Sequence, residues 1–520
     1  MDLQSPSSKT SSVLRTAFTV ILFLLTLFHM LCCTFRDIMK DYGSGAKAVE
    51  QWITLILFCL AVLCILIAVL FFPRSRSRIR ASLRLFSSYE QVFLLILLLW
   101  AVLSCWLNQR GVGIRDCWKN NDRSLYEYFW IALVFFPFAR YLGPVRARQG
   151  IETLIRLVLL PYLLLCAWML WNYLHGIEYV FPTGWKLGGD GAANSFSYGV
   201  NRNFTGSCML TMFVLCLYFA VTRKGLRKMP YLIGIPVFAF ALILTNCRTA
   251  WYSALLTVAV FGFLLGRQVT ASKPGWVRFV VPLVLSAACA FAFYWLRIGV
   301  FLYADRAISA AKAAMQPLGH TAGTGGVCLQ PLSRPAGAFV GDPQAVRPQT
   351  LAAVEPPASM RTYETGLSGR MPIYKASFVV MFSRKLFFLF GVTPYEVGPN
   401  LYGVCGVTKV YGHAHNLFLQ TGVALGVPAM IGMILFVISL GFRSIRLYRA
   451  GTVVSFSGAW MLPLILLCLL AADMMESFLA ASEWGPAQPV FYLMAGWLTA
   501  FDSDARKKSR NSTAVQRTFD

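Results

Sequence analysis

Long apolar runs separated by short polar stretches alternate along most of this chain. Twelve of these runs approach the length of about 20 residues that a helix needs to cross the hydrocarbon layer of a bilayer. They lie near residues 14–34, 51–72, 89–108, 125–141, 151–174, 203–222, 230–246, 248–266, 277–297, 415–441, 458–474 and 486–501. The pattern predicts an all-α, polytopic integral membrane protein with about 12 transmembrane helices, because a helix satisfies its own backbone polar groups in lipid.

The composition agrees with this pattern. Hydrophobic residues make up 57% of the 520 residues and charged residues only 13%, whereas soluble domains carry about a quarter charged residues. A bilayer must therefore solvate much of the surface.

Basic residues are concentrated in alternate loops between the apolar runs. The net charge of +25 by itself would suggest a nucleic-acid partner. The clusters instead share one side of the membrane, as the positive-inside rule expects of cytoplasmic loops, so no nucleic acid is expected to bind. They are Arg74 to Arg84, Arg146 and Arg148, Arg223 to Lys228, Arg267 and Lys273, Arg443 to Arg449, and Arg506 to Arg510. With twelve spans, both termini are expected in the cytoplasm.

The longest polar segment separates two groups of apolar runs. We expect spans one to nine over residues 1–297, a large periplasmic loop over 298–414, and spans ten to twelve with a basic tail over 415–520. The middle of the loop, about 317–360, is rich in Gly, Ala and Pro and is typical of a flexible excursion. From Pro372 to about Phe390 the pattern predicts an amphipathic helix. A long loop with its own helix is where function is expected.

The cysteines do not indicate a metal centre. Most of the 14 cysteines fall inside predicted spans, where a thiol behaves as a small apolar side chain. Cys117, Cys328 and Cys405 lie in outward segments, and a Cys328–Cys405 disulfide stays open for an oxidising compartment. Neither a CxxC spacing nor a nucleotide-binding motif occurs, so we expect no metal and no cofactor.

Three polar groups lie at the outward edge of the predicted bundle, where charged side chains are costly and are therefore candidates for function. Arg248 lies in a very short turn between two apolar runs, Arg370 precedes the amphipathic helix, and His415 begins the tenth run. Two guanidiniums can hold a phosphate or diphosphate, and a neutral histidine can deprotonate a hydroxyl. Together they predict a site for a phosphorylated lipid headgroup and an attacking nucleophile.

Each of these residues also has a structural interpretation. Arg248 can extend its side chain to the membrane interface, Arg370 can be an ordinary loop arginine, and a histidine at a helix start, such as His415, is more often structural. The weaker candidates can be a helix-starting residue, a structural histidine or solvated loop groups; they are Arg202, Glu364, His413 and Asn416.

Four ordered pieces of the sequence resemble the O-antigen ligase and polymerase superfamily of bacterial envelope enzymes, over roughly residues 200–435. They are Asn201-x-Asn203 at the start of a span, Arg248-x-Ala250-Trp251, Ser368-Gly369-Arg370 followed by Tyr374, and His413-Ala414-His415-Asn416 with Leu419 and Gly426-Val427-Pro428. Their order, spacing and shared outward side make the set more specific than any single piece. Two positions depart from the family, because Tyr374 stands where Trp is common and Cys247 where Ser is common.

The resemblance implies a glycosyltransferase of the bacterial inner (cytoplasmic) membrane, with its active site facing the periplasm. In that family a glycan moves from a polyprenyl-diphosphate carrier, here an undecaprenyl-diphosphate-linked donor, to a glycan acceptor without nucleotide or metal. The resemblance implies that Arg248 and Arg370 hold the donor diphosphate and that His415 is the catalytic base. The residues expected to support them are Arg202, Asn203, Glu364, Tyr374, His413 and Asn416.

The expected mechanism is a direct displacement. An acceptor hydroxyl deprotonated by His415 attacks the anomeric carbon, and Arg248 and Arg370 stabilise the leaving diphosphate. This route inverts the anomeric centre. A pair of carboxylates of the glycosidase kind is not expected, because outward acids such as Asp305 and Glu364 have no evident partner.

The acceptor and one rival class stay open. The acceptor can be a lipid A core sugar (ligase), another carrier-linked unit (polymerase) or a protein side chain (oligosaccharyltransferase); the basic chain favours the ligase, whose acceptor is rich in phosphate. A twelve-span secondary transporter would instead place polar residues and Gly/Pro breaks at mid-depth of the bilayer and repeat its pattern in two halves. The position of the polar groups at the outward edge counts against transport.

Overall fold

The computed structural model describes most of the predicted helices. It covers residues 6–39, 88–108, 114–142, 144–175, 202–315, 370–408, 410–449, 461–480 and 485–517, with the positions 56, 59, 179–180, 186–187 and 196. Outside the described residues lie the predicted second span (but for positions 56 and 59), the excursion at 317–360, Asn201, Cys328 and Glu364. Within these bounds the fold is helical, apart from the two-residue strands β1 (Tyr179–Val180) and β2 (Lys186–Leu187), which pair antiparallel.

Eight helices of the described part are long and apolar enough to cross a membrane. They are α1 (Pro6–Met39), α4 (Tyr89–Leu107), α7 (Pro144–Leu174), α8 (Arg202–Thr222), α9 (Met229–Leu244) with the short 3-10 turn η3 (Gly225–Lys228) before it, α10 (Arg248–Val269), α11 (Val277–Met315) and α16 (Val427–Arg449). The predicted all-α, multi-span architecture is confirmed at this level. The count of twelve spans stays a prediction.

The remaining helices are shorter or only partly apolar. They are α5 (Ile114–Trp130), the π-helix η2 (Ile131–Phe135), α6 (Phe138–Leu142), α12 (Met371–Ser383), α13 (Lys385–Phe390), α14 (Val397–Leu401), α15 (Leu417–Leu425), α18 (Met461–Asp473) and α19 (Ala487–Arg517). Helix α11 continues to Met315, past the predicted end of its span at residue 297, and α19 continues to Arg517.

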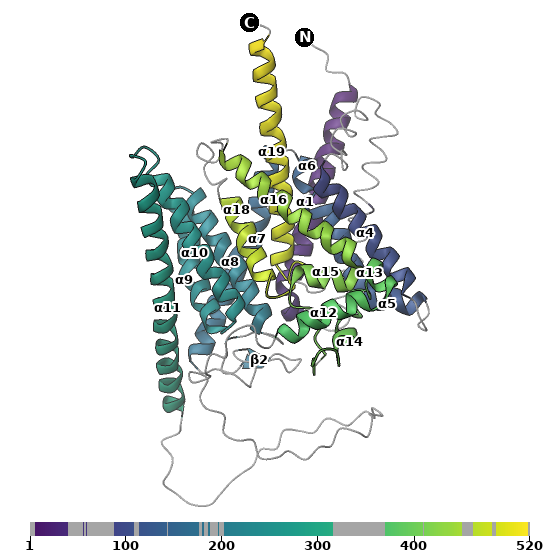
Figure 1. Cartoon of the computed structure of the whole chain (residues 1–520). Helices are drawn as coiled ribbons and strands as arrows, with labels where there is room; N and C mark the ends of the chain where they lie inside the picture. Colours follow the sequence, from purple (N-terminus) through teal and green to yellow (C-terminus); the bar gives the residue numbers. More distant parts are fainter. Residues whose placement is uncertain are drawn as a thin grey trace, which may run out of the picture.

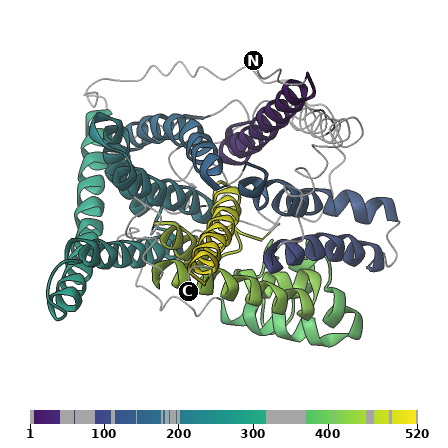
Figure 2. The ribbon, with the colours of Figure 1, turned by 90° about the horizontal axis from the view of Figure 1, so that it is seen from above.

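Helix α19 lies at the centre of the bundle, where it contacts α6, α7, α8, α16 and α18. Seen from above, α8 to α11 lie on one side of it and the green helices α12 to α16 on the other (Figure 2). Helix α1 begins and α19 ends at one end of the bundle, whereas α12 and α14 lie at the opposite end (Figure 1). The two termini of the helical bundle therefore share one end.

Two predicted spans are broken rather than continuous. The fourth, expected over 125–141, passes from α5 into the π-helix η2 and resumes as α6 after Pro137, whose ring cannot continue the ladder of helix hydrogen bonds. The tenth, expected over 415–441, consists of the short α15 and the long α16, which are separated at Gly426. The predicted amphipathic helix is likewise divided into α12 and α13, because Arg384 between them has an extended backbone.

The break at Gly426 depends on a close backbone approach. Gly426 has a φ of 93°, and a Cβ atom there would lie 2.2 Å from the carbonyl oxygen of Leu389. Gly391, at the end of α13, has a φ of 67° and faces the carbonyl group of Ala424 just as closely. Only glycine combines this conformation with this contact. The two chain segments then pair through the backbone hydrogen bonds Val392–Val423 (2.8 Å) and Thr393–Ala424 (3.0 Å).

Side chains of α4 and of Asn108, the residue that follows it, satisfy carbonyl groups at these breaks. Trp100 Nε1 donates to the carbonyl oxygen of Leu425 (2.9 Å), and Ser104 Oγ donates to that of Phe390 (2.6 Å). Asn108 Nδ2 donates to the carbonyl oxygen of Gly391 (3.1 Å). A buried carbonyl without a partner is costly in an apolar medium. Helix α4 therefore stabilises the irregular backbone on both sides of these breaks, at the ends of α13 and α15.

Buried carboxylates also join helices through ion pairs. Glu90 of α4 accepts from Arg443 of α16 at 2.6 and 2.9 Å, and Arg443 also bonds Asp502 of α19 at 2.6 Å. Glu152 of α7 accepts from Arg148 (2.9 Å), from Tyr218 of α8 (2.7 Å) and from Arg223. Each of these two glutamates thus has several donors to offset its loss of water.

We expect Gly426→Ala to lower the free energy of unfolding by more than about 2 kcal/mol, because the new Cβ adds a backbone clash to a strained φ. The thermal midpoint of the purified protein in detergent measures this. Gly403→Ala is the matched control, since Gly403 has a φ of 78° but no atom within 4 Å of the position that a Cβ would take. Equal losses in the two variants would contradict the importance of the close approach.

Candidate functional site

The turn between α9 and α10 places Arg248 and Thr249 at an edge of the bundle. Helix α9 ends at Leu244 and α10 begins at Arg248. Asn246 in the turn has a φ of 51°, a conformation that asparagine tolerates better than most residues. Arg248 is exposed and Thr249 is buried. The first turn of α10 therefore presents a cation at a helix N-terminus, the end that attracts anions.

The thiol of Cys247 in this turn is not a nucleophile at neutral pH. Burial raises the pKa of the Cys247 thiol to about 11, although the backbone N–H of Ala250 and the charges of Arg370 and Arg202 act in the opposite direction. The thiolate, which is the reactive form, is therefore scarce.

Arg370 lies immediately before α12 and reaches across to α10. Its Nη2 donates to Thr249 Oγ1 at 3.2 Å and to the carboxylate of Glu476. The Arg370 side chain is 20% exposed, whereas that of Glu476 is 1% exposed. One nitrogen of the guanidinium is thus held by Thr249 and Glu476, while part of the side chain is accessible to solvent. Its remaining N–H groups can therefore bind a ligand.

The segment His413–Asn416 is fixed in a strained conformation. His415 has a φ of 52°, in the left-handed region that residues other than glycine rarely adopt. Its carbonyl oxygen accepts a hydrogen bond from Tyr374 Oη (3.1 Å), and its N–H donates to His413 Nδ1 (3.2 Å). Strain of this kind persists only where the surroundings impose it, and it is frequent at functional sites.

Asn416 holds this segment against the loop that follows α18. Its side-chain oxygen caps α15 by accepting from the N–H groups of Phe418 (3.0 Å) and Leu419 (3.1 Å). Its Nδ2 donates to the carbonyl oxygen of Met474 (3.0 Å), and its N–H donates to Ser477 Oγ (3.1 Å). The predicted helix-starting role of Asn416 is therefore confirmed, and the residue also aligns His415 with the loop that carries Glu476.

Glu476 is the point where the polar residues meet. Its Oε1 accepts from Arg370 and from Asn203 Nδ2 (2.9 Å), while its Oε2 lies 2.8 Å from His415 Nδ1 and 3.9 Å from His413 Nε2. One buried carboxylate thus joins α8, α12 and the segment before α15. A buried charge needs such partners to offset its desolvation.

The tautomer of His415 follows from this contact. An ionised carboxylate only accepts hydrogen bonds, so the Nδ1 of His415 must carry the proton and Nε2 is left as the basic nitrogen. Burial lowers the pKa of His415, and the hydrogen bond to Glu476 opposes part of this effect. The imidazole is 12% exposed. It is therefore a neutral base that a substrate can reach at pH 7.

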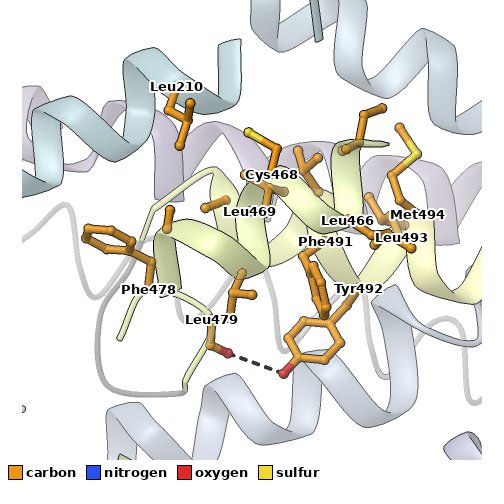
Figure 3. Close-up of a cluster of buried hydrophobic side chains, with 14 of the residues drawn as sticks. Leu210, Leu466, Cys468, Leu469, Phe478, Leu479, Phe491, Tyr492, Leu493 and Met494 are labelled. Atoms are coloured by element: carbon orange, nitrogen blue, oxygen red, sulfur yellow. Dashed lines mark hydrogen bonds between the residues drawn. The ribbon is translucent and has the colours of Figure 1, made fainter. Parts of the chain in front are cut away.

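The loop that carries Glu476 is anchored in the hydrophobic core. Phe478 and Leu479 pack among side chains of α18, α19 and Leu210 of α8, and Tyr492 Oη donates to the carbonyl oxygen of Leu479 at 3.3 Å (Figure 3). At the start of the loop, Asp473 Oδ1 accepts from the N–H of Leu479 at 2.9 Å. The position of the Glu476 carboxylate is thus set by packing on both sides.

Three potential metal ligands are also present in this group. Donor atoms of His413, His415 and Glu476 lie within 4.8 Å of one another. However, Arg370 and Asn203 already bond one oxygen of the same carboxylate, and a guanidinium repels a metal cation at such short range. The arrangement suits a base with its orienting carboxylate better than a metal centre.

Most of the sequence-predicted site residues come together. Arg370, His415, His413 and Asn203 surround Glu476, Tyr374 and Asn416 hold the segment that contains His415, and Arg248 precedes Thr249, which contacts Arg370. Arg202 begins α8, one residue before Asn203. Glu364 lies outside the described residues.

Sequence reasoning missed Glu476. The signal was present, because Glu476 follows closely after the apolar α18, at the edge that the basic loops predict to face outward, as they do for Arg248. An acid there is costly without a partner. The sequence expectation concerned the outward acids Asp305 and Glu364, and it did not include Glu476.

A comparison with known families bears on residues 233–437. These residues match the family described as O-Antigen ligase, a match that includes Arg248, Arg370 and His415. No curated protein matches the chain. The matched region contains three of the four sequence motifs found over residues 200–435, whereas Asn201-x-Asn203 lies before it. The resemblance to the O-antigen ligase and polymerase superfamily is therefore confirmed for this part of the chain.

Proposed function

We propose that this protein transfers a glycan from a polyprenyl-diphosphate carrier to an acceptor on the periplasmic face of the bacterial inner membrane, and that the acceptor is a lipid A core sugar. The observation that carries the proposal is the Glu476 carboxylate, which holds Arg370 on one oxygen and His415 on the other. It brings a cation for a leaving diphosphate and a base for an attacking hydroxyl into one group.

His415 serves as the catalytic base. Its Nε2 accepts the proton of the acceptor hydroxyl as that oxygen attacks the anomeric carbon of the donor sugar. Glu476 keeps Nδ1 protonated and stabilises the imidazolium that forms, as the carboxylate of a Ser-His-Asp triad does. His413 accepts from the N–H of His415 and so supports its strained backbone.

Arg248 and Arg370 bind the donor diphosphate. Arg248 is the first residue of α10, and the guanidinium of Arg370 bonds Thr249, the second residue. The positive end of the helix dipole adds to their charge. As the bond to the sugar breaks, negative charge grows on the diphosphate, and fixed cations stabilise it most at that stage.

The reaction is a single displacement that inverts the anomeric centre. The acceptor oxygen forms the new bond while the diphosphate leaves from the opposite side, carrying the electron pair of the broken bond. A covalent glycosyl intermediate needs a nucleophile; the Cys247 thiol is protonated at neutral pH, and Glu476 is engaged by Arg370, Asn203 and His415. No metal ion takes part in this scheme.

The orientation in the membrane is also proposed. Twelve spans with both termini in the cytoplasm agree with the shared end at which α1 begins and α19 ends, opposite α12 and α14 (Figure 1). The basic residues of η3, at Arg227 and Lys228, then face the cytoplasm. The Arg370, His415 and Glu476 group faces the periplasm.

Ligation is favoured over polymerisation and protein glycosylation by charge alone. A net charge of +25 suits an acceptor that carries several phosphates. A secondary transporter is disfavoured, because a base held by a buried carboxylate beside an arginine is an arrangement for chemistry rather than for passage of a solute.

The experiment that tests the proposal is a transfer assay with purified protein, polyprenyl-diphosphate glycan and lipid A core. We expect His415→Ala to lower the rate by about 100-fold or more, because the proton acceptor is lost. His413→Ala is the matched control and should lose less. Extension of carrier-linked glycan or modification of a protein, with no transfer to lipid A core, would refute the ligase assignment.

Glu476→Gln should change the pH dependence as well as the rate. The base works when neutral, so activity falls as the pH drops through the pKa of His415; since Glu476 raises that pKa, its removal moves the acid limb to lower pH. The rate at pH 7 should fall by about 100-fold or more, because Gln can impose the wrong tautomer. The profile of kcat/KM against pH measures both effects. An acid limb that does not move would argue against contact between these groups during catalysis.

Arg370→Lys and Arg248→Lys test the diphosphate site. Lysine keeps the charge but loses the planar fork of donors, so we expect kcat/KM for the donor to fall by about 10- to 100-fold. Arg227→Lys, at an exposed position of η3, is the matched control and should have no effect. If kcat/KM for the donor is unchanged in both variants, the two arginines do not bind the diphosphate.

A further inference from the structure

A second group of metal-ligand residues lies away from the proposed active site. His29 and Cys33, one turn apart on the same face of α1, meet Glu127 of α5. One donor atom from each residue lies within 4.8 Å of the others, and all three residues are buried. A nitrogen, a sulfur and a carboxylate oxygen are the donor types that zinc prefers.

The carboxylate of Glu127 indicates that the group binds a ligand. The side chain is 0% exposed, and among the described residues neither of its oxygens accepts a hydrogen bond. Nε2 of His29 lies 3.6 Å from Oε1 of Glu127, which is too long for a good hydrogen bond. Glu90 and Glu152, which are buried to a similar degree, each accept bonds from several donors. A buried carboxylate lacking such donors stays ionised only where another source of positive charge, such as a metal ion, compensates it.

The charge of the group matches a divalent ion. An ionised Glu127, a thiolate from Cys33 and a neutral His29 together carry two negative charges, which a divalent cation neutralises. A neutral assembly is the form that a fully buried, apolar site tolerates. Three protein ligands leave the fourth tetrahedral position of zinc for a water molecule.

The surroundings give the group a rigid frame. The His29 ring stacks on Trp130, with centroids 4.2 Å apart and planes inclined by 23°. Directly after Trp130 the α-helix widens into the π-helix η2, which packs against α1. Such widened turns are rare and are frequent at functional sites.

We propose that His29, Cys33 and Glu127 bind a zinc ion that joins α1 to α5. The ion plays no part in glycan transfer, and the site involves none of the residues around Glu476. On binding, Cys33 gives up its proton to solvent, and the zinc bonds to the thiolate sulfur, an imidazole nitrogen and a carboxylate oxygen.

The experiment measures zinc in the full-length protein, produced in zinc-containing medium and purified in detergent through an affinity tag that binds no metal. We expect about one zinc per chain in the native protein, and little in Cys33→Ser or Glu127→Gln. Cys32→Ser, which removes the neighbouring buried thiol, and His413→Ala, which disrupts the other group of potential ligands, should both keep the metal.

A second measurement guards against variants that merely fold poorly. After removal of the metal with a chelator, added Zn²⁺ should raise the thermal midpoint of the native protein and of Cys32→Ser but not of Cys33→Ser, since a ligand stabilises only the state that binds it. Native protein that contains no zinc and gains no stability from Zn²⁺ would overturn the proposal. So would zinc that is kept in Cys33→Ser and lost in His413→Ala.

Discussion

The charge of one buried carboxylate organises the group of polar residues around Arg370 and His415. Glu476 is 1% exposed, and removing a carboxylate from water costs several kcal/mol unless partners replace the lost solvation. Arg370, Asn203 and His415 supply that replacement. The same contacts that keep the charge in place therefore determine where the guanidinium lies and which nitrogen of the histidine is basic. Stability and chemistry depend on the same atoms.

The irregular backbone around this carboxylate is possible because other elements satisfy it. The segment before α15, the turn before α10 and the loop after α18 lack helix hydrogen bonds, which is costly near lipid. Asn416 caps the first turn of α15 and donates to the loop after α18. Asp473 and Tyr492 hold that loop, and α4 with Asn108 supports the break at Gly426. The long helices serve as a frame for short, non-helical pieces.

Much of this could be predicted from the sequence, because apolar length and basic loops reflect strong constraints of the bilayer. The helices, the short turn at Arg248 and the shared side of Arg248, Arg370 and His415 followed from those constraints. The breaks at Pro137 and Gly426 did not, since an apolar run has the same composition whether or not its backbone is continuous. The convergence on Glu476 was also missed, because Arg370 and His415 lie 106 and 61 residues from it along the chain. Such pairing depends on tertiary packing, which periodicity does not report.

The position of Glu476 along the chain has a consequence for how relatives are compared and recombined. The region shared with the O-antigen ligase family ends at residue 437, so it contains His415 but neither the carboxylate that orients it nor Asn203. A chimaera that exchanged only the shared region between two members would separate His415 from Glu476. Such a chimaera would be active only if the recipient carries an acidic residue between its last two helices at the position of Glu476. To transfer this site between proteins, the whole helical bundle must therefore be exchanged rather than its central segment alone.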